Sequence, residues 1–259
     1  MTDAATAPVV RSRFVAAGLH LLVSAAVAAV AALLVFTVWY PTPFNLIAGG
    51  TALFLILVSV DVVLGPALTL VAASPGKARR EFRRDLAVIV AVQLAAFSYG
   101  VYTIALARPI FQSFEVDRFR VVTAVDIERN DLDKAPSGIR ALPWLGPELI
   151  AAVPPTDPGE HLKSIELGMA GIDLSMIPSN WRSYESQKDA VWRAARPIAA
   201  LIARYPTISA DIEKAAAAQR KASAELRYLP LVSRQVSWVV LLAAPDARPI
   251  GYLPVDGFI

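Results

Sequence analysis

The sequence contains no cysteine and only two histidines, His20 and His161. Without cysteine the chain has no disulfide framework, no thiolate nucleophile and no cysteine-based metal site. It also has no H-E-x-x-H, G-x-S-x-G or phosphate-binding glycine motif, and the acidic residues of its second half are scattered. The formal net charge of +3 gives no nucleic-acid footprint. We therefore expect no catalytic residue, cofactor or metal, and a binding or assembly role rather than an enzymatic one.

Charge is scarce in the first 106 residues, where three apolar runs cover Phe14–Trp39, Leu46–Val71 and Leu86–Leu106. Each run reaches the roughly 20 residues that are needed to cross about 30 Å of hydrocarbon. The first run is too long for the apolar core of a signal peptide, which spans about 7–15 residues, so we interpret it as an uncleaved anchor. The sequence predicts a membrane protein with three N-terminal transmembrane helices in residues 14–106.

The loops between these runs predict the orientation. The link "YPTPFN" after the first run is uncharged, whereas the link after the second run is strongly basic. Its basic residues are Lys77, Arg79, Arg80, Arg83 and Arg84. Because short basic loops stay in the cytoplasm, residues 1–13 are predicted to be cytoplasmic and residues 107–259 to lie outside, which in a Gram-negative cell is the periplasm. This topology predicts a multi-pass membrane protein with Trp39 at the outer interface.

Each predicted span carries one strongly polar side chain in its inner half: His20, Asp61 or Gln93. At 1.5 Å per residue these residues lie roughly 9–15 Å from the inner ends of their runs. A charge near the bilayer centre costs at least about 2.5 kcal/mol, so such residues face other helices. We expect Asp61 to pair with His20, Gln93 or both, with help from Tyr99. This polar layer either locks the three helices together or forms a contact for a helix of another protein.

Gly65 and Pro66 follow Asp61 by one turn. Proline removes one backbone hydrogen bond and clashes with the preceding turn, which predicts a kink near Val62. A side chain of a neighbouring helix can satisfy the carbonyl that is freed. Glycine at this position lets another backbone approach closely. The alternative is a kink that serves no partner.

The second half, residues 107–259, is predicted to form an α+β domain. Phe114–Glu128 has the β-branched and aromatic content of a strand. The segment "PGEHLKSIELGMAG" predicts a short helix, and a helical stripe from Val191 to Ile202 is interrupted by Pro197. Ser209 is placed to cap an alanine-rich helix. The C-terminal "VSWVVLLAAPDARPIGYLPV" predicts two strands joined at "PDAR", and residues 130–158 predict a long loop.

Several ordered motifs resemble those of the TfpX/TfpZ type IV pilin accessory proteins, over about Phe14 to Ala124. They are Trp39–Pro41, Asp61 with Gly65–Pro66, Gly76–Lys77, Asp85–Leu86 with Gln93 and Tyr99–Gly100, Arg108–Pro109, and Phe114–Asp117–Phe119. The resemblance implies an inner-membrane protein that assists the biogenesis or dynamics of type IV pili. Its partners would be pilin subunits, which wait in the inner membrane as single apolar helices, or pilus assembly proteins.

Arg108 and Pro109 directly follow the third predicted span. Pro109 restricts Arg108 toward an extended backbone, and a guanidinium binds carboxylate in a two-pronged geometry. Arg108 is therefore a candidate partner for an acid on another chain at the outer interface. The alternative is a simple interface anchor. For the protein as a whole, the alternative to a pilus role is a membrane-anchored sensor or enzyme subunit whose periplasmic domain binds a small ligand.

Overall fold

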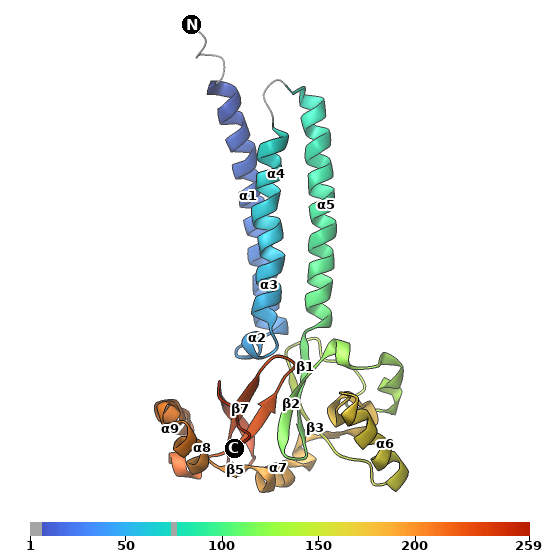
Figure 1. Cartoon of the computed structure of the whole chain (residues 1–259), viewed down its shortest axis with the longest axis vertical. Helices are drawn as coiled ribbons and strands as arrows, with labels where there is room; N and C mark the ends of the chain where they lie inside the picture. Colours follow the sequence, from blue (N-terminus) through green and yellow to red (C-terminus); the bar gives the residue numbers. More distant parts are fainter. Residues whose placement is uncertain (1–6, 74–76) are drawn as a thin grey trace. The chain divides into compact units, whose positions relative to one another are not determined.

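The computed structural model describes the backbone of residues 7–73 and 77–259, and the side chains of residues 14–73 and 77–259 (Figure 1). Residues 1–6 of the predicted cytoplasmic segment and Gly76 of the predicted inner loop lie outside the described residues. The chain divides into two units. The first holds Met1–Val38 and Gly50–Leu106, and the second holds Trp39–Gly49 and Ala107–Ile259.

The first unit consists of three long helical segments. The first segment is helix α1 (Ala7–Leu34), which continues as the π-helical turn η1 (Val35–Trp39). The last residue of η1, Trp39, already belongs to the second unit. The second segment consists of α3 (Gly50–Val58), the π-helical turn η2 (Ser59–Leu64) and α4 (Gly65–Ala72), and the third segment is α5 (Arg79–Leu106). Helix α4 packs against both α1 and α5. Three stretches, Phe14–Trp39, Gly50–Ala72 and Arg79–Leu106, are long and apolar enough to cross a membrane.

The second predicted span begins later than its composition suggested. Residues 44–47 form a separate short helix, α2 (Phe44–Ile47), which belongs to the second unit. The break falls at Gly49, whose φ of +75° is readily adopted only by glycine. Ile47 is fully buried, so an apolar residue that was assigned to lipid instead packs into the core of the second unit.

Within the described residues, the second unit contains one sheet of eight strands. They are β1 (Pro109–Glu115), β2 (Arg118–Thr123), β3 (Glu148–Ala152), β4 (Trp181–Ser183), β5 (Arg196–Pro197), β6 (Arg227–Val232), β7 (Ser237–Ala243) and β8 (Arg248–Leu253). Their order is β4-β3-β1-β2-β6-β7-β8, with β5 paired to β6. The pairs β1–β3 and β2–β6 are parallel and the others are antiparallel.

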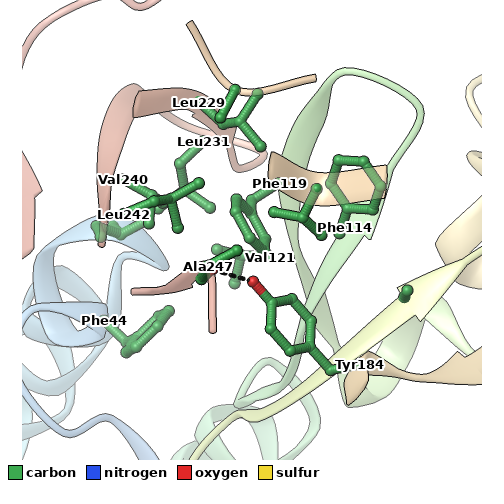
Figure 2. Close-up of a cluster of buried hydrophobic side chains, with 14 residues drawn as sticks. Phe44, Phe114, Phe119, Val121, Tyr184, Leu229, Leu231, Val240, Leu242 and Ala247 are labelled. Atoms are coloured by element: carbon green, nitrogen blue, oxygen red, sulfur yellow. Dashed lines mark hydrogen bonds between the residues drawn. The ribbon is translucent and has the colours of Figure 1, made fainter. Parts of the chain in front are cut away.

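The sheet buries apolar side chains on both faces because residues alternate along its strands. On one face, Leu229 and Val240 join a cluster with Phe44 and Tyr184, whose hydroxyl donates to the carbonyl of Ala247 (Figure 2). On the other face, side chains of β6, β7 and β8 pack against α8 (Ile198–Arg204) and α9 (Ser209–Ala218). The remaining helices are α6 (Pro158–Met169) and α7 (Lys188–Ala194).

The predicted exterior elements are partly confirmed. The short helix is α6, the C-terminal strand pair is β7 and β8, and the helical stripe breaks at Pro197 between α7 and α8. The prediction of a single strand at Phe114–Glu128 is wrong. Strand β1 begins at Pro109, and the chain reverses at Val116 and Asp117 into β2. Val116 adopts φ of 55°, which is uncommon for a β-branched residue, so the sequence carried no turn signal.

Two further expectations for this domain need correction. Ser209 is the first residue of α9 rather than its cap, and its hydroxyl donates to the carbonyl of Pro206 at 2.8 Å. The predicted loop over residues 130–158 contains β3, which completes the sheet beside β1. An apolar run of only five residues within a proline-rich segment is too short to show a clear period. Its pairing partner, β1, lies far away in the sequence and gives no local signal either.

Candidate functional site

A long groove runs between α1 and α5 in the first unit. Its wider part has a volume of about 450 Å³ and is lined by all three helical segments. A second part, of about 410 Å³, continues along α1 and η1 to Val35 and along α5 to Val101. Val27 and Phe97 line both parts, so the two form one groove. From Ala16 to Val35 the groove covers nineteen residue steps of helix, or roughly 28 Å, close to the thickness of the hydrocarbon core.

His20, Asp61 and Gln93, the three polar residues singled out in the sequence, all line the wider part of the groove. The structure adds Thr69, which is buried and lies with its Oγ1 2.6 Å from Nδ1 of His20. Nε2 of Gln93 donates to the backbone carbonyl of Asp61 at 3.2 Å. The polar groups therefore lie together, but His20 and Gln93 bind groups other than the carboxylate of Asp61.

The Asp61 side chain is only 8% exposed, and neither carboxylate oxygen has a hydrogen-bond partner among the described residues. The predicted pairing with His20 or Gln93 is therefore wrong. Tyr99, which was expected to assist, is 72% exposed and does not face this site. Asp61 is thus a buried acid that the three helices leave without a donor, within the part of the chain that the structure describes.

The backbone explains why Gln93 binds the carbonyl of Asp61 rather than its carboxylate. Asp61 lies in the π-helical turn η2, where the expected donor to its carbonyl is the N–H five residues later. That residue is Pro66, which has no N–H. The amide of Gln93 supplies the missing donor, as expected for a freed carbonyl inside a helix bundle. The irregularity lies where a kink was predicted, but its form is a π-helical turn.

Gly65 makes this contact possible. A Cβ atom at position 65 would lie 2.0 Å from Nε2 of Gln93, so any other residue would displace that amide. Glycine was expected to admit a neighbouring backbone; it admits a side chain instead. Asp61, Gly65 and Thr69 are all buried at intervals of four residues. Such a spacing drifts by about 40° per step in a regular α-helix, and a wider π-helical turn offsets part of the drift.

Arg108 and Pro109 lie in the second unit. Arg108 is 7% exposed, its guanidinium carbon lies 5.1 Å from the ring centroid of Trp144, and its Nη2 donates to the carbonyl of Pro143 at 3.3 Å. Burial lowers the pKa of Arg108, and nearby Arg129 lowers it further. Pro109 is the first residue of β1. The guanidinium thus binds groups of its own chain, and a role toward another chain would require these contacts to break.

The second unit buries a carboxylate of its own. Glu115 is 3% exposed, and its Oε2 accepts a hydrogen bond from the backbone N–H of Ser175 at 3.1 Å. Burial, followed by the charge of Asp173, raises the pKa of Glu115. His161 lies exposed on α6. No cluster of three or more potential metal ligands occurs in the described residues.

These features define a class of protein: three apolar helices that form a groove with a polar floor, followed by a sheet-containing domain. The family model of the fimbrial assembly protein FimB matches residues 8–49. The fimbrial assembly protein of Dichelobacter nodosus serogroup I is 36% identical over 227 residues, which cover 87% of this chain and 88% of that protein. The serogroup E1 protein is 35% identical over the same length and shares. The chain therefore belongs to this family of fimbrial assembly proteins.

A third relative, the fimbrial assembly protein of Dichelobacter nodosus serogroups C1 and C2, is 42% identical over 118 residues, or 46% of this chain and 90% of that protein. No solved structure gives a significant match to the chain. The relatives confirm the resemblance to type IV pilus accessory proteins that the ordered motifs indicated.

Neither Thr69 nor the groove was predicted from the sequence. Thr69 could have been found, because it follows Asp61 by eight residues and Gly65 by four, on one face of a helix. The groove itself could not, because it depends on how far α1 and α5 lie apart.

Proposed function

We propose that this protein is an inner-membrane accessory protein of type IV pilus biogenesis that binds the apolar helix of a pilin subunit in the groove between α1 and α5. The role is non-enzymatic: the protein holds or guides its partner within the bilayer. The N-terminus lies in the cytoplasm, and the second unit lies in the periplasm. The basic residues that precede and begin α5, and the family's printed role in fimbrial assembly, support this arrangement.

The observation that carries the proposal is the Asp61 carboxylate, which is buried and has no partner in the described part of the chain. Lipid tails offer no hydrogen-bond donor, so the cost of keeping a polar group there remains until a donor arrives. A helix that carries a donor group at this depth would satisfy Asp61. The length of the groove, roughly 28 Å, fits a single membrane-spanning helix.

The walls of the groove also suit a helix. Small residues of α1 line it: Ala16, Ser24, Ala26, Ala28 and Ala31. Small side chains allow two helix backbones to approach closely, which is how helices associate when lipid is as apolar as they are. A pilin helix is the occupant we favour because the relatives are named for fimbrial assembly.

Photocrosslinking within the membrane tests the occupant. Val90 and Val92 lie on the same helix, but only Val90 lines the groove, while Val92 is 63% exposed on another face. A photoreactive amino acid at position 90 should capture pilin, and the same residue at position 92 should not. Equal capture from both positions would reject the groove. Capture of an assembly protein from position 90 alone would keep the groove and replace pilin as its occupant.

Substitution of Asp61 tests the chemistry. Because the carboxylate is buried without a donor and holds no other described side chain in place, Asp61→Leu should not lower protein abundance or thermal stability, while piliation is lost. Asp61→Asn, which keeps an acceptor, should retain part of the function. If instead Asp61→Leu lowers abundance and stability together with piliation, then the residue is a lock between the helices and the docking proposal fails.

Labelling of single cysteines tests the topology, since the chain has no cysteine of its own. Ala78 precedes α5, and Lys214 lies on the exposed face of α9. A membrane-impermeant maleimide should label Lys214→Cys in cells whose outer membrane alone is permeable. Ala78→Cys should be labelled only after the inner membrane is opened. The reverse pattern would overturn the orientation.

A cavity of about 850 Å³ in the second unit favours a second candidate, a ligand-binding sensor. It lies between residues 125–134 and α6, and charged side chains of both signs line it, including Asp131, Lys134, Glu160 and Lys163. A polar small molecule that bound there would raise the unfolding temperature of the full-length protein. If small polar metabolites cause no such shift, the sensor role is rejected.

A further inference from the structure

The loop between Pro143 and Pro147 exposes two large apolar side chains in succession. Trp144 is 60% exposed and Leu145 is 70% exposed. Gly146 follows with φ of 42°, which turns the chain back toward β3. Single exposed apolar residues are ordinary on protein surfaces, but an adjacent tryptophan and leucine at the tip of a loop form a small projecting apolar patch.

Trp144 also contacts the two points where the chain leaves its first and third apolar helices. The rings of Trp144 and Trp39 lie edge to face with centroids 5.6 Å apart, and Trp39 is the last residue of the first apolar stretch. Arg108 lies 5.1 Å from the ring of Trp144, and it follows the end of α5 at Leu106 by two residues. All four of the residues that make these contacts, Trp39, Arg108, Pro143 and Trp144, belong to the second unit.

These contacts set the depth of the loop through the covalent chain. If the helices cross the membrane, as the proposed function requires, Trp39 and Arg108 lie at the boundary between hydrocarbon and headgroups. A side chain in contact with both lies at the same level. Tryptophan is enriched at this boundary because its ring is apolar while its N–H is polar.

We propose that Trp144 and Leu145 insert into the outer headgroup–acyl boundary of the inner membrane and hold the second unit against the lipid. The occupant of this surface is the bilayer itself. Trp144 contributes an interfacial ring, and Leu145, the more exposed of the two, extends into the acyl region. Arg108 keeps the loop in place from beneath, through its contacts with the Trp144 ring and the Pro143 carbonyl.

Spin labels on single cysteines test this proposal in the full-length protein, reconstituted in phosphatidylethanolamine–phosphatidylglycerol vesicles. Leu145→Cys is the test position, Lys214→Cys on α9 is the aqueous control, and Leu55→Cys on α3, which is 61% exposed outside the groove, is the lipid control. Accessibility to oxygen reports lipid, whereas accessibility to a water-soluble nickel chelate reports water. The Leu145 label should have an oxygen-to-nickel ratio severalfold above that of Lys214.

The controls separate this proposal from the one on which it rests. A lipid-like Leu55 label with a Leu145 label that matches Lys214 would overturn the interfacial loop and leave the membrane helices intact. An aqueous Leu55 label would instead contradict insertion itself.

Discussion

Each unit of this protein buries a carboxylate, and the two are in opposite situations. Glu115 lies between strands and accepts a hydrogen bond from the backbone of Ser175. Asp61 is almost as well buried, yet its oxygens have no donor among the residues described. The sheet unit therefore satisfies its buried acid internally, whereas the helical unit leaves its own acid open. A buried polar group without a partner is costly, and the proposed occupant of the groove would remove that cost from the helical unit.

The two units also use apolar residues differently. In the second unit, leucine and valine side chains are buried on both faces of one sheet, and Figure 2 shows the cluster on one of these faces. In the first unit most of the large apolar side chains are exposed, including Leu22, Val30, Leu55 and Val63. Burial drives folding in water but provides little attraction between helices in lipid. Tight packing should therefore be essential in the second unit and far less so on the outer faces of the first.

A pair of phenylalanine substitutions should show the largest difference between the units. Phe44 is 7% exposed, and its ring packs edge to face on the ring of Tyr252 with the two centroids 5.5 Å apart. Phe44→Ala should therefore destabilise the second unit by about 3–5 kcal/mol. Phe14 is 62% exposed, and Phe14→Ala should change stability little. Denaturant unfolding of the purified protein in detergent measures both. Equal losses of stability in the two variants would show that the segment Trp39–Gly49 is not part of the core of the second unit.

A pair of glycine substitutions tests the groove, with an expected loss of about 1–3 kcal/mol. Gly65→Ala would drive a methyl group into the amide of Gln93 and break its bond to the Asp61 carbonyl. Gly18→Ala on the first helix meets no atom within 4 Å and serves as the control. Thermal unfolding in detergent should show a lower midpoint for Gly65→Ala alone. The substitution Gln93→Ala should lower stability less in the Gly65→Ala protein than in the native protein, because the hydrogen bond of Gln93 is already broken there. If the two losses of stability simply add, Gly65 does not act through Gln93.

Arg108→Lys should destabilise the second unit by about 1 kcal/mol, because lysine keeps the charge but loses the planar contact with Trp144 and the bond to Pro143. Protein abundance should fall slightly, and function in proportion. Chemical unfolding of the variant, compared with Arg108→Ala, measures the loss. If stability is unchanged while piliation is abolished, the guanidinium acts on another chain, as the sequence alone suggested.

The smallest expected effect is a pH dependence at Glu115. Because burial raises its pKa in the folded state, the folded protein binds a proton more tightly than the unfolded chain does. The free energy of unfolding should therefore fall as pH rises from about 4.3, the ordinary glutamate value, through the raised folded pKa. Glu115→Gln should lack this fall. The stability of the variant minus that of the native protein should grow with pH and then level off; a constant difference contradicts the prediction.

Local patterns sufficed for some of these features and not for others. The three apolar helices follow from run length, and the β7–β8 pair follows from a short apolar run and the turn after it. Strand β6 was not predicted, because Pro230 within it argues against a central strand. Asp61 was predicted to face the other helices, because a charge is costly in lipid, and it is buried in the structure. That its carboxylate has no hydrogen-bond partner among the described residues was not predictable, because Gln93 binds the backbone carbonyl of a π-helical turn instead.

The segment Trp39–Gly49 has a consequence for the order in which the protein is made. Its side chains fill part of the core of the second unit, yet the 57 residues 50–106 separate it from the remainder of that unit. During synthesis it emerges early and must wait, with Phe44 and Ile47 uncovered, until the strands that receive it have been translated. A fragment that begins at Ala107 carries every strand but leaves both places vacant. The fold of the second unit is therefore completed by a piece that only a chain with its first two helical segments supplies.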